Sequence, residues 1–115
     1  MIHVISTLEN GGAETVLTRL IEELNHRGII QTVIVIKGNS EDFFYQKIKG
    51  LCDVYLWKID RRKVVQNFRS KKFTPTIAWM YGGIYFSYKL KFRFSLPLEI
   101  IWNIRSSHFK QPFRV

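Results

Sequence analysis

A chain of 115 residues, 46% of them hydrophobic and 23% charged, suits one folded domain and excludes a disordered protein. Its net charge of +9 resides in the second half. Residues 58–115 carry thirteen Lys/Arg and two Asp/Glu, whereas residues 1–57 carry five and seven. Such a half attracts phosphates, anionic lipid headgroups or nucleic acid, although solvated basic side chains on helix surfaces account for it equally well.

Several features that the sequence lacks indicate the cellular compartment of the protein. The single cysteine, Cys52, excludes an internal disulfide and suits a reducing environment. The first residues lack the basic start and apolar core of a signal peptide. The longest uncharged stretch, residues 73–88, is too short to span a membrane. We therefore expect a cytoplasmic protein that can rest at the inner face of a membrane. No His/Cys cluster has metal-ligand spacing, and we expect neither a metal nor a cofactor.

Strand and helix patterns alternate along the whole chain. Apolar runs predict strands at residues 2–6, 29–36, 54–57, 76–81 and 98–104. Apolar residues at spacings of three and four predict a first helix that begins at Ala13 and ends before Gly28. Further helices are predicted over 41–49 and 61–72, and Gly82-Gly83 is predicted as a turn into an aromatic stretch at 84–94. This order predicts an α/β fold with a doubly wound parallel sheet of about five strands.

The first candidate site is the turn that contains Gly11 and Gly12. A strand, a pair of glycines and a helix N-terminus present free backbone N–H groups to a phosphate or sugar oxygen. The turn lacks the GxGxxG dinucleotide pattern and the GK[ST] of a P-loop. Physically, a plain tight turn explains these residues as well as a ligand site does.

Three segments of the chain resemble retaining family 4 glycosyltransferases of the GT-B fold, including bacterial polysaccharide-biosynthesis enzymes. The first comprises Val4-Ile5-Ser6-Thr7-Leu8, Gly11-Gly12-Ala13-Glu14, Leu17, Leu20 and Leu24. The others are Trp79-Met80-Tyr81 and Ile101-Trp102-Asn103-Ile104-Arg105-Ser106. The resemblance implies that residues 1–115 form a single, incomplete Rossmann-like domain, the acceptor-side part of a truncated GT-B N-terminal domain. It also implies that the donor-binding domain, which would bind a nucleotide-sugar, is absent.

The resemblance has two local departures. The family often has histidine after the Trp-Met-Tyr segment, where this chain has Gly82. It often has histidine after the arginine that Arg105 matches, where this chain has Ser106, with His108 two places later. Both positions belong to the family's acceptor cleft, so the chemistry of the acceptor site departs from the family pattern here.

The remaining candidates lie at or near the ends of the last two predicted strands. Trp79 and Tyr81 could stack on a sugar ring at a strand end, with core packing as the alternative. Arg105 could pair with a phosphate or carboxylate, with an exposed tail as the alternative. Residues 84–94 contain five aromatic and three basic side chains. Such a mixture suits contact with an anionic membrane surface. A packed helix with a solvated basic side explains that segment too.

Together these observations predict a glycosyltransferase portion whose parent enzyme moves a sugar from a nucleotide-sugar to a glycan or lipid-linked acceptor in cell-surface polysaccharide synthesis. The expected substrate-binding residues are Gly11, Gly12, Trp79, Tyr81 and Arg105. The chain alone is expected to be inactive, because the donor site is missing. The alternatives are a non-catalytic module or remnant that needs a separate donor-domain chain, and a basic nucleic-acid-binding domain. No nucleic acid is expected as a partner, because no recognition motif is present.

Overall fold

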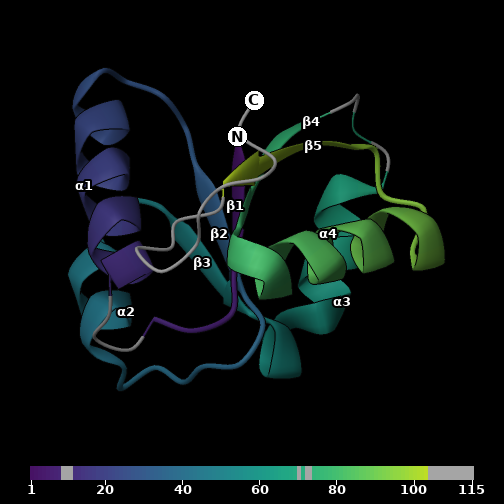
Figure 1. Ribbon diagram of the computed structural model, residues 1–115, viewed down its shortest axis with the longest axis horizontal. Helices are drawn as coiled ribbons and strands as arrows, with labels where there is room; N and C mark the ends of the chain where they lie inside the picture. Colours follow the sequence, from purple (N-terminus) through teal and green to yellow (C-terminus); the bar gives the residue numbers. More distant parts are fainter. Residues whose placement is uncertain (9–11, 70, 72–73, 104–115) are drawn as a thin grey trace, which may run out of the picture.

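The computed structural model describes residues 1–8, 12–69, 71 and 74–103. Five parallel strands form one sheet in the order β3-β2-β1-β4-β5 (Figure 1). The strands are β1 (Ile2–Ile5), β2 (Thr32–Val35), β3 (Asp53–Leu56), β4 (Thr74–Trp79) and β5 (Leu98–Asn103). The helices are α1 (Gly12–His26), α2 (Phe43–Ile48), α3 (Trp57–Phe68) and α4 (Met80–Arg93). The predicted α/β fold with a five-stranded, doubly wound parallel sheet is confirmed.

The helices form two layers, one on each side of the sheet. Figure 1 shows α1 and α2 on one side and α3 and α4 on the other. The chain builds β1, β2 and β3 outward in one direction and then returns to place β4 on the free edge of β1. Because right-handed crossovers fix the side on which each helix lies, this reversal sends the later helices to the opposite face.

The core therefore has two halves, separated by the sheet. Alternate residues of β1 serve both halves: Ile2 and Val4 pack under α3 and α4, while Ile5 packs under α1 and α2. All four residues of β1 and all four of β2 are buried. This explains why their sequences are nearly continuous apolar runs, as expected for strands that helices cover on both faces.

The junction between β4 and α4 differs from the sequence-based prediction. The fourth strand was expected over 76–81, with a turn at Gly82-Gly83, but β4 ends at Trp79 and both glycines lie inside α4. Met80 has a φ of 60°, the left-handed conformation that non-glycine residues rarely adopt. This one residue turns the chain from strand to helix, so no separate loop is needed.

Candidate functional site

The carboxyl ends of β1 and β4 form the natural ligand-binding position of this sheet. The two strands are neighbours, and the helices that follow them leave on opposite sides (Figure 1). In open α/β sheets, ligands bind at such a point of reversal. Ser6 and Thr7 follow β1 at this edge, and Met80 follows β4.

Two glycines allow the first turn of α4 to lie directly on the end of β1. A Cβ atom at Gly83 would lie 2.6 Å from the Val4 carbonyl oxygen, and one at Gly82 would overlap the Ser6 hydroxyl. Real Cβ atoms do not approach backbone oxygens this closely. The glycines therefore allow α4 to lie close to β1, which gives a structural reason for glycine at positions 82 and 83.

Backbone hydrogen bonds hold the segment after β1 in place. The Lys37 amide donates to the Ser6 carbonyl at 2.7 Å, and the Ile36 amide donates to the Ile5 carbonyl at 2.9 Å. The Thr7 hydroxyl donates to the Glu14 carboxylate at 3.2 Å, which joins this segment to the first turn of α1. The residues that flank the predicted glycine turn are thus fixed on both sides.

A polar pocket of about 420 Å³ lies beside this point. Its lining comes from the segments after β1 and β2 and from the first turn of α3: Thr7, Lys37, Gly38, Asn39, Asp42, Lys58 and Ile59. The Asp42 carboxylate accepts from the Asn39 amide at 3.0 Å, which closes a tight turn. Two lysines and a hydroxyl in one hollow suit a ligand that combines hydroxyl groups with negative charge.

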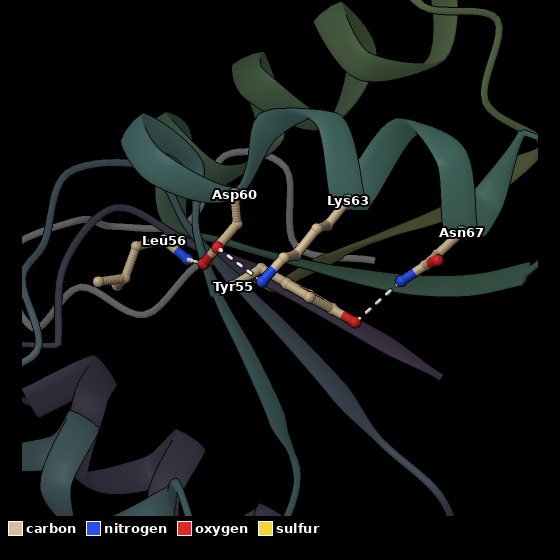
Figure 2. A network of polar contacts seen from close by, with 5 residues as sticks. All are labelled: Tyr55, Leu56, Asp60, Lys63 and Asn67. Carbon is tan, nitrogen blue, oxygen red and sulfur yellow. Dashed lines mark hydrogen bonds and ion pairs between the residues drawn. The ribbon is translucent and has the colours of Figure 1, made fainter.

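The first turn of α3 is positioned by Asp60, as Figure 2 shows. Its carboxylate reaches back and accepts a hydrogen bond from the Leu56 amide at 3.0 Å. Asp60 has non-helical angles (φ −103°, ψ 15°), so the helix kinks there. Farther along α3, Asn67 donates to the Tyr55 hydroxyl at 3.0 Å. α3 begins at Trp57, four residues before the predicted start at residue 61, and its first turn carries Lys58, which lines the pocket.

A buried polar relay runs from β4 through β1 toward α1. The Trp79 indole donates from Nε1 to His3 Nδ1 at 3.2 Å, and His3 Nε2 lies 2.9 Å from Gln31 Oε1. Because an indole N–H can only donate, Nδ1 must accept, and the proton of neutral His3 resides on Nε2. Gln31 in turn donates to the Ile21 carbonyl at 3.0 Å. Burial lowers the pKa of His3, an effect that the hydrogen bond to Gln31 partly opposes.

The predicted site residues do not gather in one place. Gly12 begins α1, and a side chain there would meet no described atom within 4 Å. Trp79 is completely buried, so its ring serves the core and offers no face for stacking on a sugar. Tyr81 is 54% exposed but lines a different hollow, on the outer side of α4. Gly11 and Arg105, like His108, lie outside the described residues.

Several pocket residues escaped the sequence analysis. Lys37 follows the second predicted strand, Asp42 lies in the helix predicted over 41–49, and Lys58 follows the third predicted strand. A systematic inspection of the residue after each predicted strand would have found Lys58, because parallel strands present their carboxyl ends at one edge. Trp102 was recognised only as part of a motif, yet it is 57% exposed.

Other reactive groups point to no separate centre. Burial, with a smaller effect of neighbouring Asp53, raises the pKa of the Cys52 thiol to about 11, so the nucleophilic thiolate is scarce near neutral pH. Within the described part of the chain, no group of three or more His, Cys, Asp or Glu side chains could hold a metal ion. No helix there is long and apolar enough to cross a bilayer.

No protein-family model, curated protein or solved structure matches the chain.

Proposed function

We propose that this chain forms the acceptor-side part of a glycosyltransferase, which moves a sugar from a nucleotide-sugar to a glycan or lipid-linked acceptor in cell-surface polysaccharide synthesis. The observation that carries the proposal is the arrangement at the carboxyl edge of β1. There the reversal point of the sheet, the start of α1 at Gly12, where a Cβ would meet no described atom within 4 Å, and the pocket with Lys37 and Lys58 belong to the same edge. Three segments that resemble family 4 glycosyltransferases support it independently.

Each part of this edge has a role in the proposal. The start of α1 supplies backbone N–H groups and the positive end of a helix dipole to a phosphate or sugar oxygen. Lys37 and Lys58 attract the negative charge of a phosphate-bearing acceptor, and the Thr7 hydroxyl oxygen, which donates its proton to Glu14, can accept a hydrogen bond from a sugar hydroxyl. Stabilisation of the charge on the departing nucleotide would be electrostatic, and it would need a donor-binding domain opposite this edge.

The test is a titration of the ¹⁵N-labelled 115-residue chain with farnesyl-diphosphate-linked N-acetylglucosamine, a lipid-linked acceptor analogue. We expect amide shifts at Thr7, Gly12, Lys37 and Lys58, and weaker binding by K58Q because a pocket cation is lost. The matched control is K49Q, which removes a lysine that does not line the pocket. Shifts confined to other residues, or equal weakening by both variants, would contradict the assignment of this edge.

A turnover assay addresses the division of labour between domains. With uridine diphosphate N-acetylglucosamine and the same acceptor, the chain alone should release no uridine diphosphate, because the proposal assigns donor binding to another domain. Release of uridine diphosphate above the uncatalysed rate would overturn that assignment.

A further inference from the structure

The outward side of α4 carries aromatic rings where a surface helix ordinarily carries polar residues. Four exposed residues recur at spacings of four, three and four: Tyr81, Tyr85, Tyr88 and Phe92. Their exposed fractions are 54, 74, 36 and 73%, so the core does not use these rings fully. The opposite side of the helix already supplies the core, through Phe86 and Leu90.

Strand β5 adds a fifth ring to this stripe. The Trp102 indole N–H donates to the Tyr88 hydroxyl at 3.2 Å, and the ring centroids of Tyr88 and Trp102 lie 6.4 Å apart. Tyr88 also stacks on Phe92, with centroids 6.1 Å apart and ring planes 10° from parallel. The five residues, which we call the aromatic face, border a hollow of about 820 Å³ together with Lys89 and Arg93.

The charge near the aromatic face is mainly positive. α4 carries Lys89, Lys91 and Arg93 and no acidic residue, whereas β5 carries one exposed acidic residue, Glu99. The aromatic face therefore lies in a positive field, which attracts an anionic surface and repels a second copy of a chain whose net charge is +9. Single-stranded nucleic acid is also anionic, but its contacts with proteins are mainly charge pairing and base stacking. The ring of Phe92 is fully apolar and 73% exposed, which favours the apolar interior of a membrane as the partner.

We propose that the aromatic face, flanked by Lys89 and Arg93, is the surface by which this protein lies on an anionic lipid membrane. The rings enter the headgroup region, where the polar tips of Tyr and Trp stay hydrated and the ring bodies leave water. The basic side chains contact lipid phosphates. The stripe from Tyr81 to Phe92 spans about 16 Å at the helical rise per residue, so α4 lies along the membrane plane.

This inference is independent of sugar transfer and extends the contact expected at residues 84–94 to Tyr81 and Trp102. Failure to bind an acceptor analogue would leave it untouched, and failure to bind a membrane would leave the proposed acceptor site untouched. The two proposals concern different surfaces: the polar pocket lies beside the carboxyl end of β1, and the aromatic face lies on α4 and β5.

The experiment is sedimentation of the 115-residue chain with phosphatidylcholine vesicles that contain about one third phosphatidylglycerol. We expect binding to these vesicles, weaker binding at high salt and little binding to pure phosphatidylcholine. Tryptophan emission gives a second readout. Trp102 is 57% exposed, whereas Trp57 and Trp79 are 7% and 0% exposed. Vesicles should therefore shift the emission to the blue, and W102F should lose that shift.

Matched variants separate the aromatic face from general hydrophobicity and charge. Y85S/F92S should abolish sedimentation, whereas I30S/F43S, which removes two other exposed apolar side chains, should retain it. K89Q/R93Q should weaken binding roughly 30-fold, since each basic residue near an anionic surface contributes a factor of about five. K47Q/K49Q, at the C-terminal end of α2, should weaken it far less. Circular dichroism of each variant establishes that it remains folded.

Three outcomes would overturn the proposal. The first is equal binding to neutral and anionic vesicles. The second is binding of a single-stranded oligonucleotide by a chain that does not sediment with anionic vesicles. The third is self-association that Y85S/F92S removes, which would assign the aromatic face to a second copy.

Discussion

The two helical layers cover the same sheet with similar inner surfaces and different outer surfaces. Toward the sheet, α1 and α2 present Leu17, Ile21, Phe44 and Ile48, and α3 and α4 present Val64, Phe68, Phe86 and Leu90. Toward solvent, α1 exposes Glu22 and Glu23. Arg27, the residue that follows α1, forms an ion pair with Glu23 at 3.0 Å. The outer side of α4 exposes rings and cations instead.

This difference separates what the fold requires from what it leaves free. Burial against the sheet demands apolar residues on both inner surfaces. Folding demands nothing comparable of the outer surfaces, and a mixed polar surface such as that of α1 satisfies it. The fold does not require the aromatic and basic outer surface of α4, which is why we propose an external contact on that side of the molecule.

The largest expected effect tests whether the two layers are equally necessary. Leu17→Ala on α1 and Leu90→Ala on α4 each empty a fully buried position. Each should lower the free energy of unfolding by about 2–5 kcal/mol, through lost burial and a residual cavity. Urea unfolding monitored by circular dichroism measures both. A negligible loss for either variant would show that its layer is not part of the cooperative core.

A smaller loss of stability is expected from substitutions at the start of α4, with the start of α1 as the comparison. Gly83→Ala should cost about 2 kcal/mol, because the new Cβ meets the Val4 carbonyl oxygen and the backbone must shift. Gly82→Ala should cost less, since the Ser6 hydroxyl can rotate away. Gly12→Ala, at the start of α1, meets no described atom and serves as the control. Equal midpoints of urea unfolding for all three would contradict the close packing of α4 on β1.

The smallest effect concerns His3, on the α1 and α2 side of the sheet. Burial lowers its folded-state pKa below the ordinary value of 6.5. Below that value the unfolded chain takes up a proton that the folded chain resists, so stability falls as the pH drops from 6.5 toward the lowered pKa. The loss should approach, at most, about 1.4 kcal/mol per pH unit.

Urea midpoints at several pH values, for the wild type and two variants, measure this slope. His3→Gln should flatten it between neutral and mildly acidic pH, because the titrating group is gone. His26→Gln, which alters an exposed residue at the end of α1, should leave most of it in place. An unchanged slope in His3→Gln would remove His3 as its cause.

The fold could be predicted because its strongest patterns are local. The apolar stripe that includes Leu17 and Ile21 predicted α1, and the apolar runs at residues 2–6 and 29–36 predicted two central strands. The boundary at Met80 could not be predicted, because a left-handed non-glycine residue is stabilised by its surroundings and has no sequence signature. The start of α3 at Trp57 could not be predicted either, because its first turn is capped by a hydrogen bond from the Leu56 amide to the Asp60 carboxylate.

The candidate site was harder to predict than the fold. Trp79 at a strand end suggested ring stacking, but alternation along β4 directs its side chain into the core, where His3 accepts its hydrogen bond. The pocket joins Thr7, Lys37 and Lys58, which are far apart in the sequence. Only the strand order brings them together, and that order is a property of the whole chain.

The central position of β1 has a consequence for how the protein is made. β1 precedes the other four strands of this sheet in the chain, and it pairs with β2 on one edge and with β4 on the other, where Ile2 lies opposite Thr76. On the ribosome, this apolar strand must therefore wait with one edge unpaired until most of the chain has emerged. Such distant pairing slows folding and lengthens the exposure of an aggregation-prone edge. β1 precedes its partner strands in the chain and is nevertheless among the last of them to be enclosed.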